Sequence, residues 1–139
     1  MASAAVELDP RLIAFVLPSI PESARMARFH IRAALGFHGL DEYADDAEAI
    51  TSELVANAVQ HVRGDGTNTI VVTLARVLNP AAVTVVVSDS SSQGPIRRDT
   101  SADSDHGRGL QIVEALSAHW GWRQQDGGKA VFAVLAREV

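Results

Sequence analysis

The feature that most constrains the fold is a long amphipathic segment that starts near Asp41 and ends near Val62. Apolar side chains recur in it at the three- and four-residue spacing of one helix face. They are Tyr43, Ala47, Ile50, Leu54, Ala58 and Val62. Asp41 suits a helix N-cap, and the Gly64-Asp65-Gly66 turn follows the last apolar position. The pattern predicts a long helix with one buried face.

Two further helices and five strands are predicted around this segment. The helices are expected at residues 24–35, after a Ser-Ile-Pro-Glu start at 19–22, and at 107–116. Runs rich in β-branched residues, separated by turn residues, predict strands. They are expected at residues 11–17, 68–78, 81–87, 119–124 and 130–135. Short turns at Asn79-Pro80 and Asp126-Gly127-Gly128 predict that the last four strands form two hairpins.

The remaining segments are a loose leader at residues 1–9 and a long loop at residues 90–106. The loop is rich in Ser and Asp and has no helix or strand periodicity, and long loops in compact domains are often functional. With 139 residues, no repeat and no linker, the chain is expected to be one domain, 1–139.

Composition argues against several classes of partner. A formal charge of −5 and a pI near 5.4 disfavour direct binding to a nucleic-acid backbone. The apolar run at residues 12–17 stops at Pro18 and is too short for a signal peptide or a membrane span. The absence of cysteine excludes disulfides and suits a reducing compartment. We therefore expect a cytoplasmic protein that does not bind membranes.

Two common nucleotide-binding motifs are also disfavoured. Lys129 is the only lysine, no Ser or Thr follows it, and Arg123 stands where a P-loop would begin with glycine. The Gly107-Arg108-Gly109 turn lacks the third glycine of a Rossmann fingerprint, since Ile112 occupies that position.

Polar residues form a row on the long predicted helix, where Glu53, Asn57 and His61 are spaced four residues apart. A carboxylate can accept a proton, and a carboxamide one turn later can offer its oxygen to Mg²⁺. The alternative interpretation is a solvated helix edge, and the spacing alone does not decide between them.

Two other segments are candidates for nucleotide contacts. Asp89 ends an apolar strand, and its carboxylate could accept a hydrogen bond from an exocyclic amino group such as that of adenine. An Asx turn is the alternative. Gly107-Arg108-Gly109-Leu110 is expected to open a helix, where backbone amides favour a phosphate and Arg108 adds charge. A tight turn without a ligand is the alternative there.

Taken in order, these segments resemble a known set of motifs. They are Glu53-Leu54-Val55-Ala56-Asn57-Ala58, Val87-Ser88-Asp89 and Gly107-Arg108-Gly109-Leu110. They resemble the N box and the two glycine boxes of the gyrase, histidine-kinase and mismatch-repair ATPase superfamily. The resemblance covers nearly the whole chain. The chain length and the Trp120-Gly121-Trp122 segment look most like stand-alone regulators of the anti-sigma-factor serine-kinase type found in actinobacteria.

The resemblance implies an α/β fold, a two-layer sandwich whose mixed sheet carries its helices on one face. It implies that ATP is bound with Mg²⁺, that Asn57 coordinates the metal, that Glu53 is the general base, and that Asp89 receives the adenine amino group. His61 and residues 107–110 would lie near the phosphates, and residues 90–106 would form the lid. The implied partners are a sigma factor and an anti-anti-sigma protein whose serine is phosphorylated.

Two departures from the family pattern leave a second function open. Ser91 stands where the family usually has glycine, and Ala130 where it commonly has a threonine that helps to hold adenine. The alternative is a non-catalytic, nucleotide-gated binding module of the same fold. A detached sensor-kinase domain is disfavoured, because no dimerisation helix with a phosphoacceptor histidine is visible. The sigma factor, the phosphoacceptor and the oligomeric state, a homodimer included, stay open.

Overall fold

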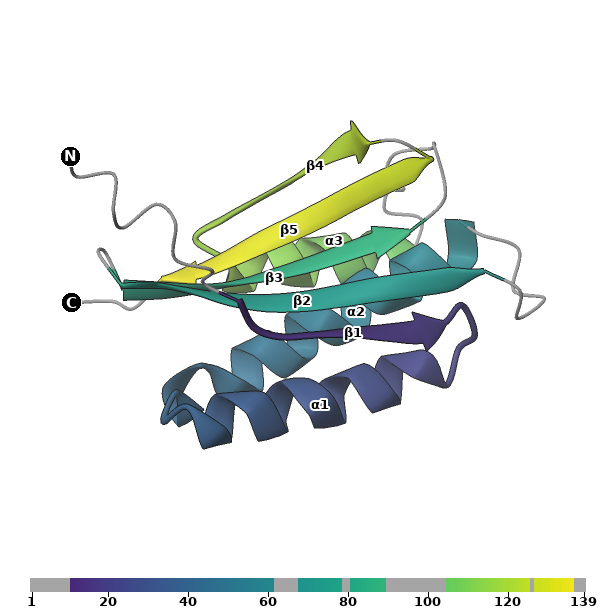
Figure 1. Ribbon diagram of the computed structural model, residues 1–139. Coiled ribbons are helices and arrows are strands. Elements are labelled where there is room, and N and C mark those ends of the chain that lie inside the picture. Colours follow the sequence, from purple (N-terminus) through teal and green to yellow (C-terminus); the bar gives the residue numbers. More distant parts are fainter. Residues whose placement is uncertain (1–10, 62–67, 79–80, 90–104, 126, 137–139) are drawn as a thin grey trace, which may run out of the picture.

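The protein is described here by a computed structural model that defines residues 11–61, 68–78, 81–89, 105–125 and 127–136. In chain order the elements are β1 (Arg11–Pro18), α1 (Ser23–Phe37), the short 3-10 helix η2 (Asp41–Tyr43), α2 (Ala44–His61), β2 (Thr69–Leu78), β3 (Ala81–Asp89), α3 (Asp105–Leu116), β4 (His119–Gln125) and β5 (Gly128–Ala136). Within these residues one sheet has the strand order β1-β2-β3-β5-β4. The three α-helices lie on one face of that sheet (Figure 1).

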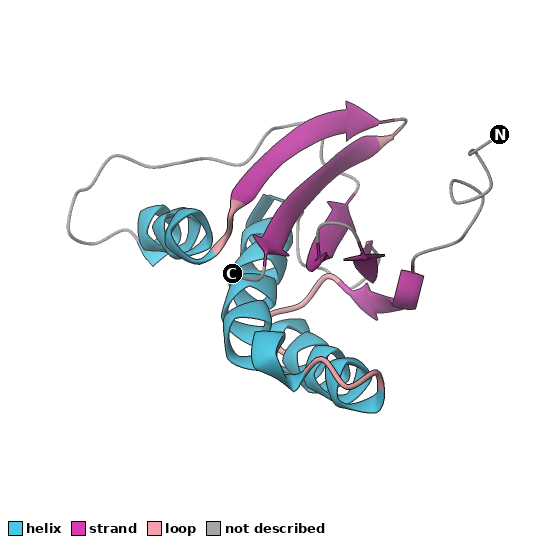
Figure 2. Ribbon diagram, turned by 90° about the vertical axis from the view of Figure 1, so that its left-hand side faces the viewer, coloured by secondary structure: helices cyan, strands magenta, loops and turns pink. Residues whose placement is uncertain are grey.

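This arrangement confirms the two-layer α/β sandwich, and the view turned by 90° shows the helices as a layer under the curved sheet (Figure 2). All four pairs of neighbouring strands are antiparallel, so the sheet is not mixed as expected. Two of these pairs are hairpins, which are antiparallel because the chain reverses in a short turn. After the β4–β5 hairpin the chain pairs β5 with β3, and these two strands run in opposite directions.

The long amphipathic segment forms η2 and α2, which confirms the predicted helix and its buried face. Its apolar stripe is inaccessible to solvent up to the last position that the structure describes. The buried members are Tyr43, Ala47, Ile50, Leu54 and Ala58. The expected stripe of α1 is buried as well, with Ala27, Ile31 and Leu35 completely inaccessible. Both stripes therefore join one core beneath the sheet.

Two helix boundaries differ from the prediction. α1 continues through Gly36 to Phe37, and the chain then turns at Gly39, whose φ of 72° favours glycine. α3 begins at Asp105, two residues before the predicted start at Gly107.

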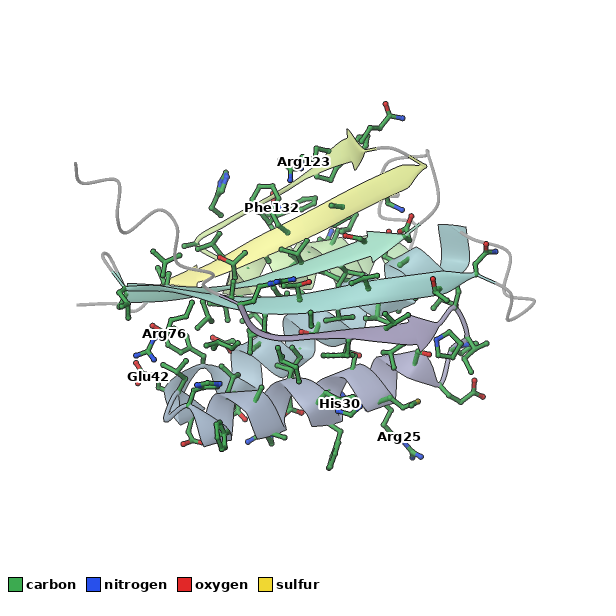
Figure 3. All side chains as sticks on the ribbon, in the orientation of Figure 1. Arg25, His30, Glu42, Arg76, Arg123 and Phe132 are labelled. Atoms are coloured by element: carbon green, nitrogen blue, oxygen red, sulfur yellow. The ribbon has the colours of Figure 1, made fainter. Side chains whose placement is uncertain are left out.

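Side chains alternate between the two faces of the sheet, as strand geometry requires. Residues such as Val72, Val85 and Ala133 are buried and belong to the core beneath the sheet. On the other face Val16 and Val71 are exposed, and Phe132 projects from β5 away from the helices (Figure 3). In the part of the chain that the structure describes, no helix is long and apolar enough to cross a membrane.

Candidate functional site

The candidate site lies at one end of the sandwich, on the right in Figure 1, where α2 and β3 end and β5 begins. α2 contacts both of these strands and also packs against α3. Residues from all four elements, far apart in the sequence, are thereby brought to the same end of the molecule. These elements carry the residues that the sequence singled out.

Glu53 and Asn57 lie one turn apart on α2, and both are half-buried. Asn57 Oδ1 is buried and has no hydrogen-bond partner among the residues that the structure describes. Glu53 is engaged in a polar interaction of its own. A buried oxygen without a donor is unusual in a folded protein, because such groups are nearly always paired. No described residue supplies a donor for this oxygen.

His61 is the last residue of α2 and continues the row of Glu53 and Asn57 in the sequence. The structure describes its backbone, and its side chain lies outside the described part. The same holds for the side chains at 107–109, whose backbone forms the first turns of α3. Leu110, the last residue of that motif, is 2% exposed and therefore contributes to packing.

Asp89 is the last residue of β3, as the sequence predicted, but its partner was missed. Lys129, the second residue of β5, is its direct cross-strand neighbour. Lys129 Nζ donates to Asp89 Oδ2 over 2.7 Å, and the two side chains are 0% and 1% exposed. A buried ion pair thus stands where the sequence predicted a carboxylate alone.

The register of β3 and β5 also corrects the expectation for Ala130. Ala130 pairs with Ser88, one position away from Asp89, so its side chain lies on the opposite face of the sheet. Lys129 is therefore the residue that stands beside the Asp89 carboxylate. The sequence signal available was the uniqueness of Lys129 as a lysine next to the hairpin turn, but only the register reveals its partner.

The sequence was compared with models of protein families, and one family model matches most of the chain. The family model described as the histidine kinase-like ATPase domain matches residues 17–135, which include all described elements except most of β1 and the last residue of β5. The chain belongs to this family. The resemblance read from the motifs at residues 53–58, 87–89 and 107–110 is thereby confirmed at the level of the family.

One solved structure shows that the fold of this histidine kinase-like ATPase domain recurs. The chain is similar to the crystal structure of the RsbU and RsbW domains of Rv1364c from Mycobacterium tuberculosis, with a TM-score of 0.67 and 24% identity. That match covers 92% of this chain and 32% of the other, so the chain spans about a third of its length. A histidine kinase domain from the blue-light activated histidine kinase of Erythrobacter litoralis EL346 matches with a TM-score of 0.49 and 20% identity, over 86% and 61% of the two chains. A comparison with curated protein sequences finds no match.

The residues present fit a magnesium ion of the kind that accompanies a nucleotide. Mg²⁺ usually takes one or two oxygen ligands from the protein and completes its shell with phosphate oxygens and water. Asn57 Oδ1 is such an oxygen, buried and without a donor. The expected lid at 90–106, with Ser91, and the leader at 1–9 lie outside the described residues, except that 105 and 106 belong to α3.

Proposed function

We propose that this protein binds Mg-ATP and is a serine-protein kinase of the anti-sigma-factor type. It phosphorylates a serine of an anti-anti-sigma partner, sequesters a sigma factor and works in the cytoplasm. The observation that carries the proposal is the buried Oδ1 of Asn57, which has no hydrogen-bond partner among the described residues and lies one turn after a carboxylate on the same helix. Membership of the histidine kinase-like ATPase family supports ATP as the nucleotide.

Each part of the nucleotide has a proposed binding group. Asp89 accepts a hydrogen bond from the exocyclic amino group of adenine. Residues 107–110, in the first turns of α3, lie near the phosphates, and Arg108 and His61 contribute side-chain contacts. Asn57 Oδ1 would hold Mg²⁺, which when bound offsets the negative charge of the phosphates.

Glu53 is the proposed general base. Its carboxylate orients the serine hydroxyl of the partner and accepts the hydroxyl proton as the serine oxygen attacks the γ-phosphorus. The new serine O–P bond forms while the bond between the γ-phosphorus and the bridging oxygen of ADP breaks. Glu53 precedes Asn57 by one turn, so the proton acceptor and the metal ligand both lie near the phosphate end of the nucleotide.

A non-catalytic, nucleotide-gated binding module of the same fold is the second candidate. One observation favours it: Oδ2 of Asp89 already accepts a hydrogen bond from Lys129, so part of the acceptor capacity expected for adenine is in use. Such a module would bind its partner in one nucleotide state and transfer no phosphate.

The two candidates are separated by an assay for phosphate transfer. Partners captured from the native cell by the full chain are identified by mass spectrometry and then incubated with the chain and ATP labelled on the γ-phosphate. Labelled phosphoserine on a captured anti-anti-sigma protein supports the kinase. Nucleotide-dependent capture without label supports the binding module. Capture that ATP and ADP do not affect, together with no labelled partner, contradicts both.

A further inference from the structure

Lys129 is an unusual group because its whole side chain is buried. Its exposure is 0%, it is the only lysine of the chain, and Asp89 Oδ2 is the single acceptor that its ammonium has among the described residues. An ammonium carries three N–H donors, so two donors of Lys129 lack a partner there. Burying a charge is tolerated when it is both paired and fully hydrogen-bonded. The first condition is met here, and the described residues do not meet the second.

We propose that Lys129 is a nucleobase-binding residue of the nucleotide site, an inference that rests on the proposed function. Asp89 and Lys129 place an acceptor and spare donors side by side at the adjoining ends of β3 and β5. Adenine offers the complementary edge, because its exocyclic amino group is a donor flanked by ring nitrogens that are acceptors. Asp89 accepts from the amino group while Lys129 donates to one of the adjacent ring nitrogens.

Charge explains why the base, and not a phosphate, is the expected contact. The Asp89 carboxylate lies 2.7 Å from the ammonium and balances its charge, so the pair as a whole does not attract an anion. A phosphate near Lys129 would also meet the negative charge of Asp89. A neutral heterocycle with an acceptor beside a donor satisfies both groups without adding charge.

Burial of the pair has a consequence for binding. With side-chain exposures of 0% and 1%, neither group is reached by a ligand until the surrounding surface opens. Once the base is in place, its hydrogen bonds form away from water, where they are stronger than at the surface. Lys129 thereby acts as a specificity-determining residue that favours bases with an acceptor next to the amino group.

The test uses ATP and two analogues in which a carbon replaces one ring nitrogen, 1-deaza-ATP and 7-deaza-ATP. Each is titrated with Mg²⁺ into the wild-type chain and into Lys129→Met by calorimetry. For the wild type we expect one analogue to bind about tenfold or more weakly than ATP, as the loss of a hydrogen bond to a charged donor implies. In Lys129→Met this difference between ATP and that analogue should disappear. Arg25→Met, which removes an exposed cation of α1, is the matched control and should behave like the wild type.

Equal affinities of the wild type for all three nucleotides would overturn the inference and leave the proposed function standing. This comparison needs no variant and therefore holds even if Lys129→Met does not fold. The inference would also be overturned if folded Lys129→Met bound ATP as tightly as the wild type. Lys129 would then fill the place of the base in the free protein without binding it. If the wild type binds none of the nucleotides, the inference and the proposed function both fail.

Discussion

Asp89 and Lys129 are direct cross-strand neighbours in β3 and β5, and their side chains form an ion pair that is almost completely buried. The two opposite charges therefore lie side by side, away from solvent. Removing one partner leaves a buried charge, and this is a more severe change than removing both.

The first prediction concerns the stability that depends on this pair. Lys129→Met should lower the free energy of unfolding by about 3–5 kcal/mol, because Asp89 stays buried and loses the cation of its ion pair. The double variant Asp89→Val, Lys129→Met should regain most of that loss. Urea denaturation of the four proteins of this cycle measures the coupling. Strictly additive losses would contradict a direct interaction.

A second prediction tests the packing of α2 under the sheet. Leu54 is 2% exposed within the core, so Leu54→Ala should destabilise the protein by about 2–5 kcal/mol through lost burial and an internal cavity. Phe37 at the end of α1 is 85% exposed, and Phe37→Ala should change stability by less than about 0.5 kcal/mol. Thermal or urea unfolding of both variants provides the comparison, and equal effects would contradict the described core.

The third prediction addresses adenine recognition by Asp89. Asp89→Asn should weaken ATP binding, because an amide can present a donor where the amino group of adenine needs an acceptor. The variant also leaves Lys129 without its carboxylate, so folding must be verified by circular dichroism before calorimetry. Unchanged ATP affinity in a folded Asp89→Asn variant would show that Asp89 does not contact the base.

The fourth prediction separates chemistry from binding. Glu53→Ala should keep ATP affinity within a few-fold but reduce phosphate transfer by about a hundredfold or more, since a general base acts mainly in the transition state. The measurements are calorimetry and transfer of labelled phosphate on the same preparation. Undiminished transfer would remove Glu53 from the role of base.

Much of the fold could be predicted from the sequence because the periodic pattern of apolar residues is strong. The stripe from Tyr43 to Ala58 predicted α2, and the turn residues predicted both hairpins. The start of α3 was placed two residues late, since the glycines at 107 and 109 suggested a turn while the helix already includes them. Local patterns define elements well and their ends less well.

The candidate site could be predicted only in part from the sequence, because one of its contacts depends on strand register. Glu53 and Asn57 follow from helical spacing, which is local, and the structure places them one turn apart as predicted. The partnership of Asp89 with Lys129 joins residues forty positions apart and depends on the register of β3 and β5. A shift of one residue would exchange Lys129 for Ala130, and the sequence alone does not fix that register.

The role of Asn57 in Mg-dependent nucleotide binding can be measured by calorimetry of ATP with Mg²⁺ and with a chelator. The wild type should bind ATP more tightly with Mg²⁺, and Asn57→Ala should lose about tenfold or more of that affinity, as removal of groups around a metal typically does. Ser52→Ala is the matched control, because Ser52 lies on the same helix but accepts a hydrogen bond from Arg28 of α1. It should titrate like the wild type. Equal ATP affinity with and without Mg²⁺, or an Asn57→Ala variant that binds Mg-ATP as tightly as the wild type, would contradict the account.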